Sequence, residues 1–149
     1  VEAVVAVNDQ RKRAMGRKII AAMGGDVRGK TVAILGLTFK PNTDDMRDSP
    51  AIAVIQTLQD QGAIIRAYDP EGVEQAKKVL DNVTYCEGPY QAVEGADAVA
   101  IVTEWNQFRA LDLKRIKSLL KGNVVVDLRN IYDPAAVTAE GLSYSSVGR

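Results

Sequence analysis

Three features of this 149-residue sequence predict an α/β fold with a parallel sheet. From residue 29 onward, short apolar runs of strand length alternate with segments of helical character. These runs are nearly continuous, which is typical of strands that are covered on both faces. A hydrophobic content of 46% fits one domain with a core. Because parallel strands are joined by right-handed crossovers, we expect a doubly wound, Rossmann-like sheet of about six strands, preceded by a long N-terminal helix.

The first element is expected to be a helix over residues 1–25 that ends at Gly24 and Gly25, since glycine commonly terminates helices. Apolar side chains such as Ile19 form a broad stripe along it, and basic residues occupy much of the remaining surface. Two interpretations stay open. The helix either packs on its own domain, or it continues an element from upstream sequence and lies in an interface.

Six strands and five helical segments are expected to follow. The strands are predicted at residues 30–37, 63–70, 83–86, 96–103, 123–129 and 142–148. The helical segments are predicted at residues 49–61, 71–80, 89–96, 111–120 and 133–141. Ser49 is a favourable N-cap and Pro50 a favourable first-turn residue, so the start of the 49–61 helix is well marked.

Composition excludes several classes of function. The formal net charge is zero, with 19 basic and 19 acidic residues, so neither nucleic acid nor an anionic membrane is an expected partner. No apolar run is long enough to span a bilayer. A single cysteine, Cys86, fits the cytoplasm, and the absence of histidine argues against a zinc site or a Ser-His-Asp triad. Because the sequence begins at Val1 in mid-pattern, we expect a fragment or a processed piece.

One charged loop, GLTFKPNTDDMRDSPA (residues 36–51), lies where a ligand is expected. In doubly wound sheets, ligands bind beyond the carboxyl ends of the strands, where the strand order reverses. In the commonest order this brings the loop beside TEWNQF (residues 103–108) after the fourth strand. Lys40 and Arg47, near the start of the helix after Ser49, suit a pyrophosphate. The alternative is a solvated turn with local salt bridges.

Other residues at the strand ends are less specific. Gly36 is not followed by the G-x-G-x-x-G pattern of dinucleotide-binding turns. Asp69 stands where such folds hold a ribose, but a strand-end turn is the preferred interpretation. Arg129 can donate a bidentate pair to a phosphate or carboxylate, or it forms an ion pair with Asp127 or Asp133.

Trp105 and Cys86 receive structural interpretations. Trp105 is the only tryptophan, and we expect it to be a core residue in the wall of the ligand crevice. Cys86 is expected to be a small buried hydrophobe without a catalytic role.

The charged loop, followed in order by YDP, TEWNQF and DLRNIYDP, closely resembles the carboxyl-terminal, UDP-binding domain of UDP-glucose 6-dehydrogenases, in the UDP-glucose/GDP-mannose dehydrogenase family. The resemblance covers nearly the whole chain. It implies that residues 1–25 are the end of a central connecting and dimerisation helix and residues 26–149 the nucleotide-sugar-binding domain. It further implies an NAD-dependent, two-step oxidation of UDP-glucose to UDP-glucuronate through an enzyme thioester, serving polysaccharide biosynthesis in the cytoplasm.

The resemblance also assigns site residues. It places substrate contacts at Phe39 and Lys40, a contact to the cofactor pyrophosphate at Arg47, and a contact near the UDP moiety at Arg129. Asn130 departs from members that carry a second arginine there. No catalytic residue is assigned, because the resemblance puts the nucleophilic cysteine and the NAD-binding half upstream of this chain. The implied partners are a UDP-sugar, that amino-terminal half and a second subunit in a homodimer, and the fragment alone is expected to be inactive.

Other functions remain open on sequence alone. The chain could be a domain of a related UDP-N-acetylmannosamine or GDP-mannose dehydrogenase. It could also be a stand-alone nucleotide-binding regulatory module, or a domain that mainly supplies a dimer interface through its first helix.

Overall fold

The computed structural model describes residues 2–38, 40–42 and 49–147, without the side chains of residues 2–9. The strands are β1 (Thr31–Leu35), β2 (Ile64–Tyr68), β3 (Val83–Tyr85), β4 (Ala98–Ile101), β5 (Val124–Asp127) and β6 (Ser143–Ser146). The helices are α1 (Glu2–Ala22), α2 (Pro50–Asp60), α3 (Val73–Lys77), α4 (Pro89–Val93), α5 (Asn106–Arg109), α6 (Leu113–Leu119) and α7 (Pro134–Ala139).

The six strands form one parallel sheet in the order β3-β2-β1-β4-β5-β6, which confirms the predicted doubly wound fold. The order reverses between β1 and β4, where Leu35 pairs with Ile101. The carboxyl ends of these two strands therefore lie side by side, as the sequence led us to expect.

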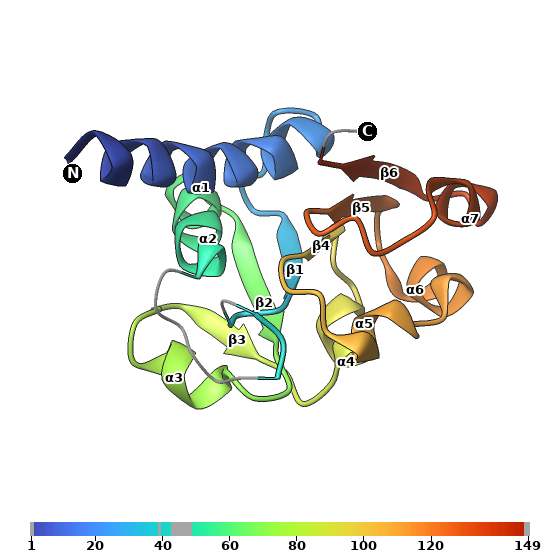
Figure 1. Ribbon diagram of the computed structural model, residues 1–149. Coiled ribbons are helices and arrows are strands. Elements are labelled where there is room, and N and C mark those ends of the chain that lie inside the picture. The colour runs from blue at the N-terminus through green and yellow to red at the C-terminus, as the bar shows by residue number, and fades with distance from the viewer. Residues whose placement is uncertain (1, 39, 43–48, 148–149) are drawn as a thin grey trace.

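Two apolar clusters cover the two faces of the sheet. Successive residues of β1 alternate between them: Val32 and Ile34 belong to one cluster, Ala33 and Leu35 to the other. The first cluster packs against α1, α2 and α3, and the second against α4, α5, α6 and α7. Figure 1 shows α1 and α2 on one side of the sheet and α4, α5 and α6 on the other. Both faces are therefore buried, which explains the nearly continuous apolar runs.

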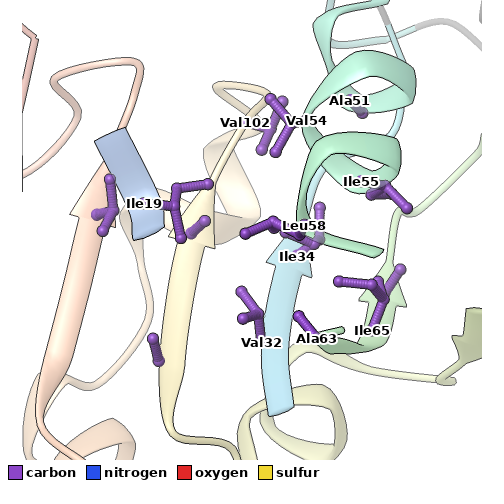
Figure 2. Close-up of a cluster of buried hydrophobic side chains, with 14 of the residues drawn as sticks. Ile19, Val32, Ile34, Ala51, Val54, Ile55, Leu58, Ala63, Ile65 and Val102 are labelled. Carbon is purple, nitrogen blue, oxygen red and sulfur yellow. The ribbon is translucent and has the colours of Figure 1, made fainter. Parts of the chain in front are cut away.

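Helix α2 forms the main contact with the first face. Its buried residues recur at helical spacing: Ala51, Val54, Ile55 and Leu58. In Figure 2, Leu58 lies beside Ile34 of β1, and Val54 lies beside Val102, which follows β4. Ser49 caps the helix, since its hydroxyl accepts a hydrogen bond from the Ala51 amide at 3.2 Å. The predicted N-cap is thus confirmed, and it fixes where the charged loop ends.

Helix α1 packs on α2 through its carboxyl-terminal half. Ile19 is fully buried, and Gly16 lies so close to Thr57 that a Cβ at Gly16 would stand 2.8 Å from the Thr57 Cβ. Figure 1 shows that α1 extends past α2 towards the amino terminus. Packing on its own domain is therefore observed for the second half of the helix, and an interface role for the first half stays a prediction.

The structure departs from expectation in a few places. The sequence prediction left residues 106–109 unassigned, and they form the short helix α5. Helix α3 covers only Val73–Lys77 of the expected segment 71–80. No helix in the described ranges is long and apolar enough to cross a membrane.

Candidate functional site

Asp69 joins the carboxyl ends of three strands. Its side chain is only 3% exposed and lies just after β2. The Oδ2 atom accepts hydrogen bonds from the Leu37 amide (2.8 Å), from the Thr38 amide and hydroxyl (3.2 Å each), and from Nε1 of Trp105 (3.2 Å). The Oδ1 atom accepts from the amides of Glu71 (2.8 Å) and Gly72 (2.7 Å). Asp69 thus anchors the start of the charged loop to the segments that follow β2 and β4.

Gly36 allows the loop to leave β1 directly against the end of β4. Its backbone φ of +104° is a conformation that residues other than glycine rarely adopt. A Cβ there would stand 2.5 Å from both the amide nitrogen and the hydroxyl oxygen of Thr103. The Thr103 hydroxyl donates to the Thr38 carbonyl at 2.8 Å, so the first residues of the loop are held against β4.

Ser49 ties the far end of the loop back to its beginning. Its buried hydroxyl donates to the Leu37 carbonyl at 2.6 Å and accepts from the Ala51 amide. The two ends of the segment 36–50 are therefore held together by specific hydrogen bonds. Both ends of the loop therefore lie together beyond the carboxyl end of β1.

Of the predicted loop residues, the structure describes Lys40 but not Phe39 or Arg47, which lie outside the described residues. Lys40 is exposed, and its neighbour Asn42 has a φ of +64°. Asparagine tolerates this left-handed conformation better than most residues, so Asn42 suits a turn. Lys40 therefore stands in the loop after β1 as a solvent-exposed residue.

Arg129 follows β5 at the same edge of the sheet, separated from β1 by β4. Its guanidinium contacts one carboxylate oxygen of Glu104: Nε donates to Oε2 at 2.5 Å, and Nη2 contacts the same oxygen. The sequence left open an ion pair of Arg129 with Asp127 or Asp133, and this expectation is wrong because the arginine pairs with Glu104. Asp127 is fully buried, and Asp133 caps α7 by accepting from the Ala135 amide at 3.2 Å.

The carboxylate of Asp127 organises the turn after β5. It accepts from the backbone amides of Arg129 (3.1 Å), Ile131 (2.9 Å) and Tyr132 (3.0 Å), and from the Tyr144 hydroxyl (2.7 Å). These bonds satisfy its buried charge within the fold. Asp127 is therefore a structural residue that positions the backbone of Arg129.

Tyr132 and Asn130 complete this turn. The Tyr132 hydroxyl donates to the Phe108 carbonyl at 2.5 Å. Burial, followed by the nearby Asp127 carboxylate, raises the pKa of Tyr132 well above its ordinary value. Asn130 bonds the backbone of Val147 twice, from Nδ2 to the carbonyl oxygen at 2.9 Å and from Oδ1 to the amide at 3.1 Å. The residue that departs from the family motif thus fastens the end of β6.

An open concave region lies between α1 and α2. It is an open hollow of about 770 Å³ whose α1 wall includes Lys12, Arg13 and Arg17 and whose α2 wall includes Gln56 and Asp60. The hollow runs along the two helices and reaches Ser49 at the start of α2, but no residue of β1 or β4 lines it. We therefore place the candidate ligand site at the strand ends, where the reversal of strand order lies beside the connections that carry Lys40 and Arg129.

Sequence reasoning missed two contributions to this edge. Asp69 was interpreted as a turn residue, and only its spatial neighbours show that it gathers six donor contacts from three segments. Glu104 was quoted within TEWNQF without a role, although its position after β4 places it beside the end of β5. The interpretation of Trp105 as a core residue agrees with its 8% exposure.

These features define a Rossmann-like α/β domain with cationic side chains at the carboxyl edge of the sheet and without the dinucleotide fingerprint. The family follows from comparison with known sequences. The model for the UDP binding domain of the UDP-glucose/GDP-mannose dehydrogenase family matches residues 33–134. The chain belongs to this family.

Individual relatives agree with that membership. UDP-glucose 6-dehydrogenase of Rhizobium meliloti (strain 1021) is 61% identical over the whole chain, which spans 34% of that relative. A UDP-glucose dehydrogenase structure from Pyrobaculum islandicum matches 97% of the chain with a TM-score of 0.77 and 35% identity, and 31% of that protein is covered. An NDP-N-acetyl-D-galactosaminuronic acid dehydrogenase structure from Methanosarcina mazei Go1 matches 97% with a TM-score of 0.83 and 25% identity, over 30% of its length. The chain thus spans about a third of these relatives.

The usual dinucleotide site of the fold does not fit NAD in this domain. The turn after β1 carries Gly36 alone, and the loop reaches α2 only at Pro50. Asp69 stands where an acidic residue would bind the ribose, but both of its oxygens are engaged by protein donors. The β1–α2 connection therefore lacks the features by which such folds bind a dinucleotide.

Proposed function

We propose that this chain is the nucleotide-sugar-binding domain of an NAD-dependent UDP-glucose 6-dehydrogenase. The complete enzyme oxidises the C6 alcohol of UDP-glucose to the carboxylate of UDP-glucuronate in two steps, through an enzyme-bound thioester. The observation that carries the proposal is the family match over residues 33–134 combined with cationic side chains at the carboxyl edge of the sheet. Relatives that bear this enzyme name over the full chain support the choice of substrate.

Within this domain we assign substrate binding to Phe39, Lys40 and Arg129. Exposure of Lys40 and the location of Arg129 at the same sheet edge support the assignment. An ammonium group acts as a point charge for a sugar or phosphate oxygen, whereas a guanidinium can bind two oxygens at once. Arg47 is proposed to contact the pyrophosphate of NAD held by another part of the enzyme.

The thiol chemistry and most NAD contacts are proposed to belong to the remainder of the enzyme. Cys86 is only 6% exposed, and its Sγ lies 3.9 Å from the Thr84 carbonyl oxygen, which suits a buried structural thiol. The 149-residue chain, mixed with UDP-glucose and NAD, is therefore expected to form no NADH above a blank without protein. NADH formation by the purified chain would contradict this division of labour.

We also propose that residues 1–25 form the end of a connecting helix that contributes to a homodimer and that residues 26–149 form the binding domain. The extension of α1 beyond α2 supports this division (Figure 1). A reducing compartment, the cytoplasm, is proposed because the single cysteine is a free, buried thiol. Light scattering of the complete enzyme is expected to give twice the subunit mass, and a monomer would contradict the proposed dimer.

Calorimetric titration of the chain tests the ligand assignment. UDP and UDP-glucose are expected to bind more tightly than GDP. Lys40→Ala and Arg129→Ala are each expected to weaken UDP binding by about 1.5–3 kcal/mol, the usual loss for a charged hydrogen bond. Lys121→Ala is the matched control, because Lys121 is an exposed lysine in the connection before β5, at the opposite edge of the sheet. Equal UDP affinity for wild type and both site variants would refute the site.

A further inference from the structure

The contact between Glu104 and Arg129 is asymmetric. Glu104 follows β4 and Arg129 follows β5, and these adjacent strands bring the two side chains together. Both Nε and Nη2 of Arg129 are directed to the same oxygen, Oε2 of Glu104. The carboxylate therefore engages the side of the guanidinium and not its end.

Side-on engagement leaves a recognition edge available. A guanidinium carries five N–H groups in a fixed plane, and Glu104 occupies one on Nε and one on Nη2. The second N–H of Nη2 and both N–H groups of Nη1 form the end of the fork, which can bind two oxygens of a phosphate or carboxylate. Among the described residues, Glu104 is the only side chain seen to contact this guanidinium.

The pair contributes little to folding. The side chains of Arg129 and Glu104 are 36% and 23% exposed, and ion pairs at such sites add only modestly to stability because solvent screens them. The Arg129 backbone is held separately, because its amide donates a hydrogen bond to the Asp127 carboxylate. Glu104 is therefore not needed to form the turn, and its effect is on the direction of one arginine side chain.

We propose that Glu104 is a positioning residue that orients Arg129 so that the end of its guanidinium faces the diphosphate of the bound nucleotide. This inference rests on the proposed function, which assigns Arg129 to the nucleotide sugar. Glu104 touches neither substrate nor cofactor in this scheme. It lowers the rotational freedom of Arg129 before the ligand arrives, and pre-organisation of this kind strengthens binding.

Removing Glu104 has two opposing consequences, and a set of variants separates them. Loss of its negative charge favours an anionic ligand, whereas loss of its oxygen frees Arg129. Glu104→Gln removes the charge but keeps an acceptor oxygen, and Glu104→Ala removes both. Positioning therefore predicts that the alanine variant binds UDP about two- to fivefold more weakly than the glutamine variant, the range measured for partly exposed ion pairs. A local charge effect alone predicts equal affinities for the two variants.

A double-mutant cycle on UDP affinity, measured with this chain by calorimetry, tests the connection. In an Arg129→Ala background, Glu104→Ala and Glu104→Gln are expected to bind UDP with equal affinity, because only the loss of charge remains once the arginine is absent. Uridine, which lacks the diphosphate, is expected to bind all variants equally. Glu140→Gln, before β6 at the opposite edge of the sheet, is the control for net charge. Thermal unfolding of each variant verifies that it is folded.

The outcomes are distinguishable. If Arg129→Ala leaves UDP affinity unchanged, the proposed site and the positioning role both fail. If Arg129→Ala weakens binding but Glu104→Ala and Glu104→Gln bind equally, the site stands and the positioning role is overturned. Equal effects of Glu104→Ala with and without Arg129 would likewise overturn it.

Discussion

The carboxylate of Asp69 is predicted to dominate the stability of the carboxyl edge of the sheet. Replacing it with asparagine keeps the shape of the side chain and one acceptor oxygen. The amide is expected to keep its oxygen at the Oδ2 position, which receives four of the six donor contacts. Its NH₂ group then faces the amides of Glu71 and Gly72, which lose their acceptor.

The magnitude follows from these two orphaned donors. A buried donor left without a partner costs about 1–3 kcal/mol, which applies to the buried Gly72 amide, whereas Glu71 is exposed and its amide loses less. We therefore expect Asp69→Asn to lower the free energy of unfolding by about 2–4 kcal/mol. Because small domains are stabilised by about 5–15 kcal/mol, the variant is expected to fold. Asp69→Ala removes every acceptor and is expected to lose more.

Urea unfolding followed by tryptophan fluorescence measures this loss. Trp105 is the only tryptophan, and its indole N–H donates to Asp69, so its emission reports on the edge directly. Asp133→Asn is the control, since it removes the same charge but keeps an N-cap of equal quality at α7. A loss below about 0.5 kcal/mol for Asp69→Asn, the size of ordinary surface effects, would refute the role assigned to this carboxylate.

Two further predictions concern the same edge. Gly36→Ala is expected to destabilise the domain far more than Gly25→Ala in thermal unfolding. Both glycines have positive φ, but only the first would place a Cβ against Thr103, so equal losses would show that the clash is irrelevant. The raised pKa of Tyr132 predicts an alkaline loss of stability. Above pH about 10 the unfolded chain ionises this tyrosine while the folded chain keeps its proton, so stability falls as the pH rises towards the folded pKa. Tyr132→Phe is expected to make the free energy of unfolding fall less steeply as the pH rises. An equally steep fall in the variant and the wild type would contradict this.

Much of the fold could be predicted from the sequence because its signals are local. Apolar runs at the observed strands, together with Ser49 and Pro50 at the start of α2, mark elements without reference to distant residues. The strand order was expected from general rules of chain topology, and the position of the charged loop followed from it. The short helix α5 escaped prediction because four residues carry no periodic pattern.

Side-chain partners could not be predicted, since they depend on the register between strands. Asp69 is separated by 32 residues from Leu37 and by 36 from Trp105, and no local pattern links them. Arg129 has acidic neighbours in sequence, yet it pairs with Glu104, which is 25 residues away. The alignment of β4 with β5 determines which acidic residue lies beside Arg129, and this alignment becomes visible only in the assembled sheet.

The most direct test of the proposed function is to map UDP onto the chain by NMR. We expect UDP to shift the backbone amides of Thr38, Lys40, Glu104 and Arg129, at the carboxyl ends of β1, β4 and β5. Amides along the hollow between α1 and α2, such as those of Arg17 and Gln56, are expected to stay unchanged. Shifts confined to that hollow, or none at saturating UDP, would contradict a nucleotide site at the carboxyl edge of the sheet.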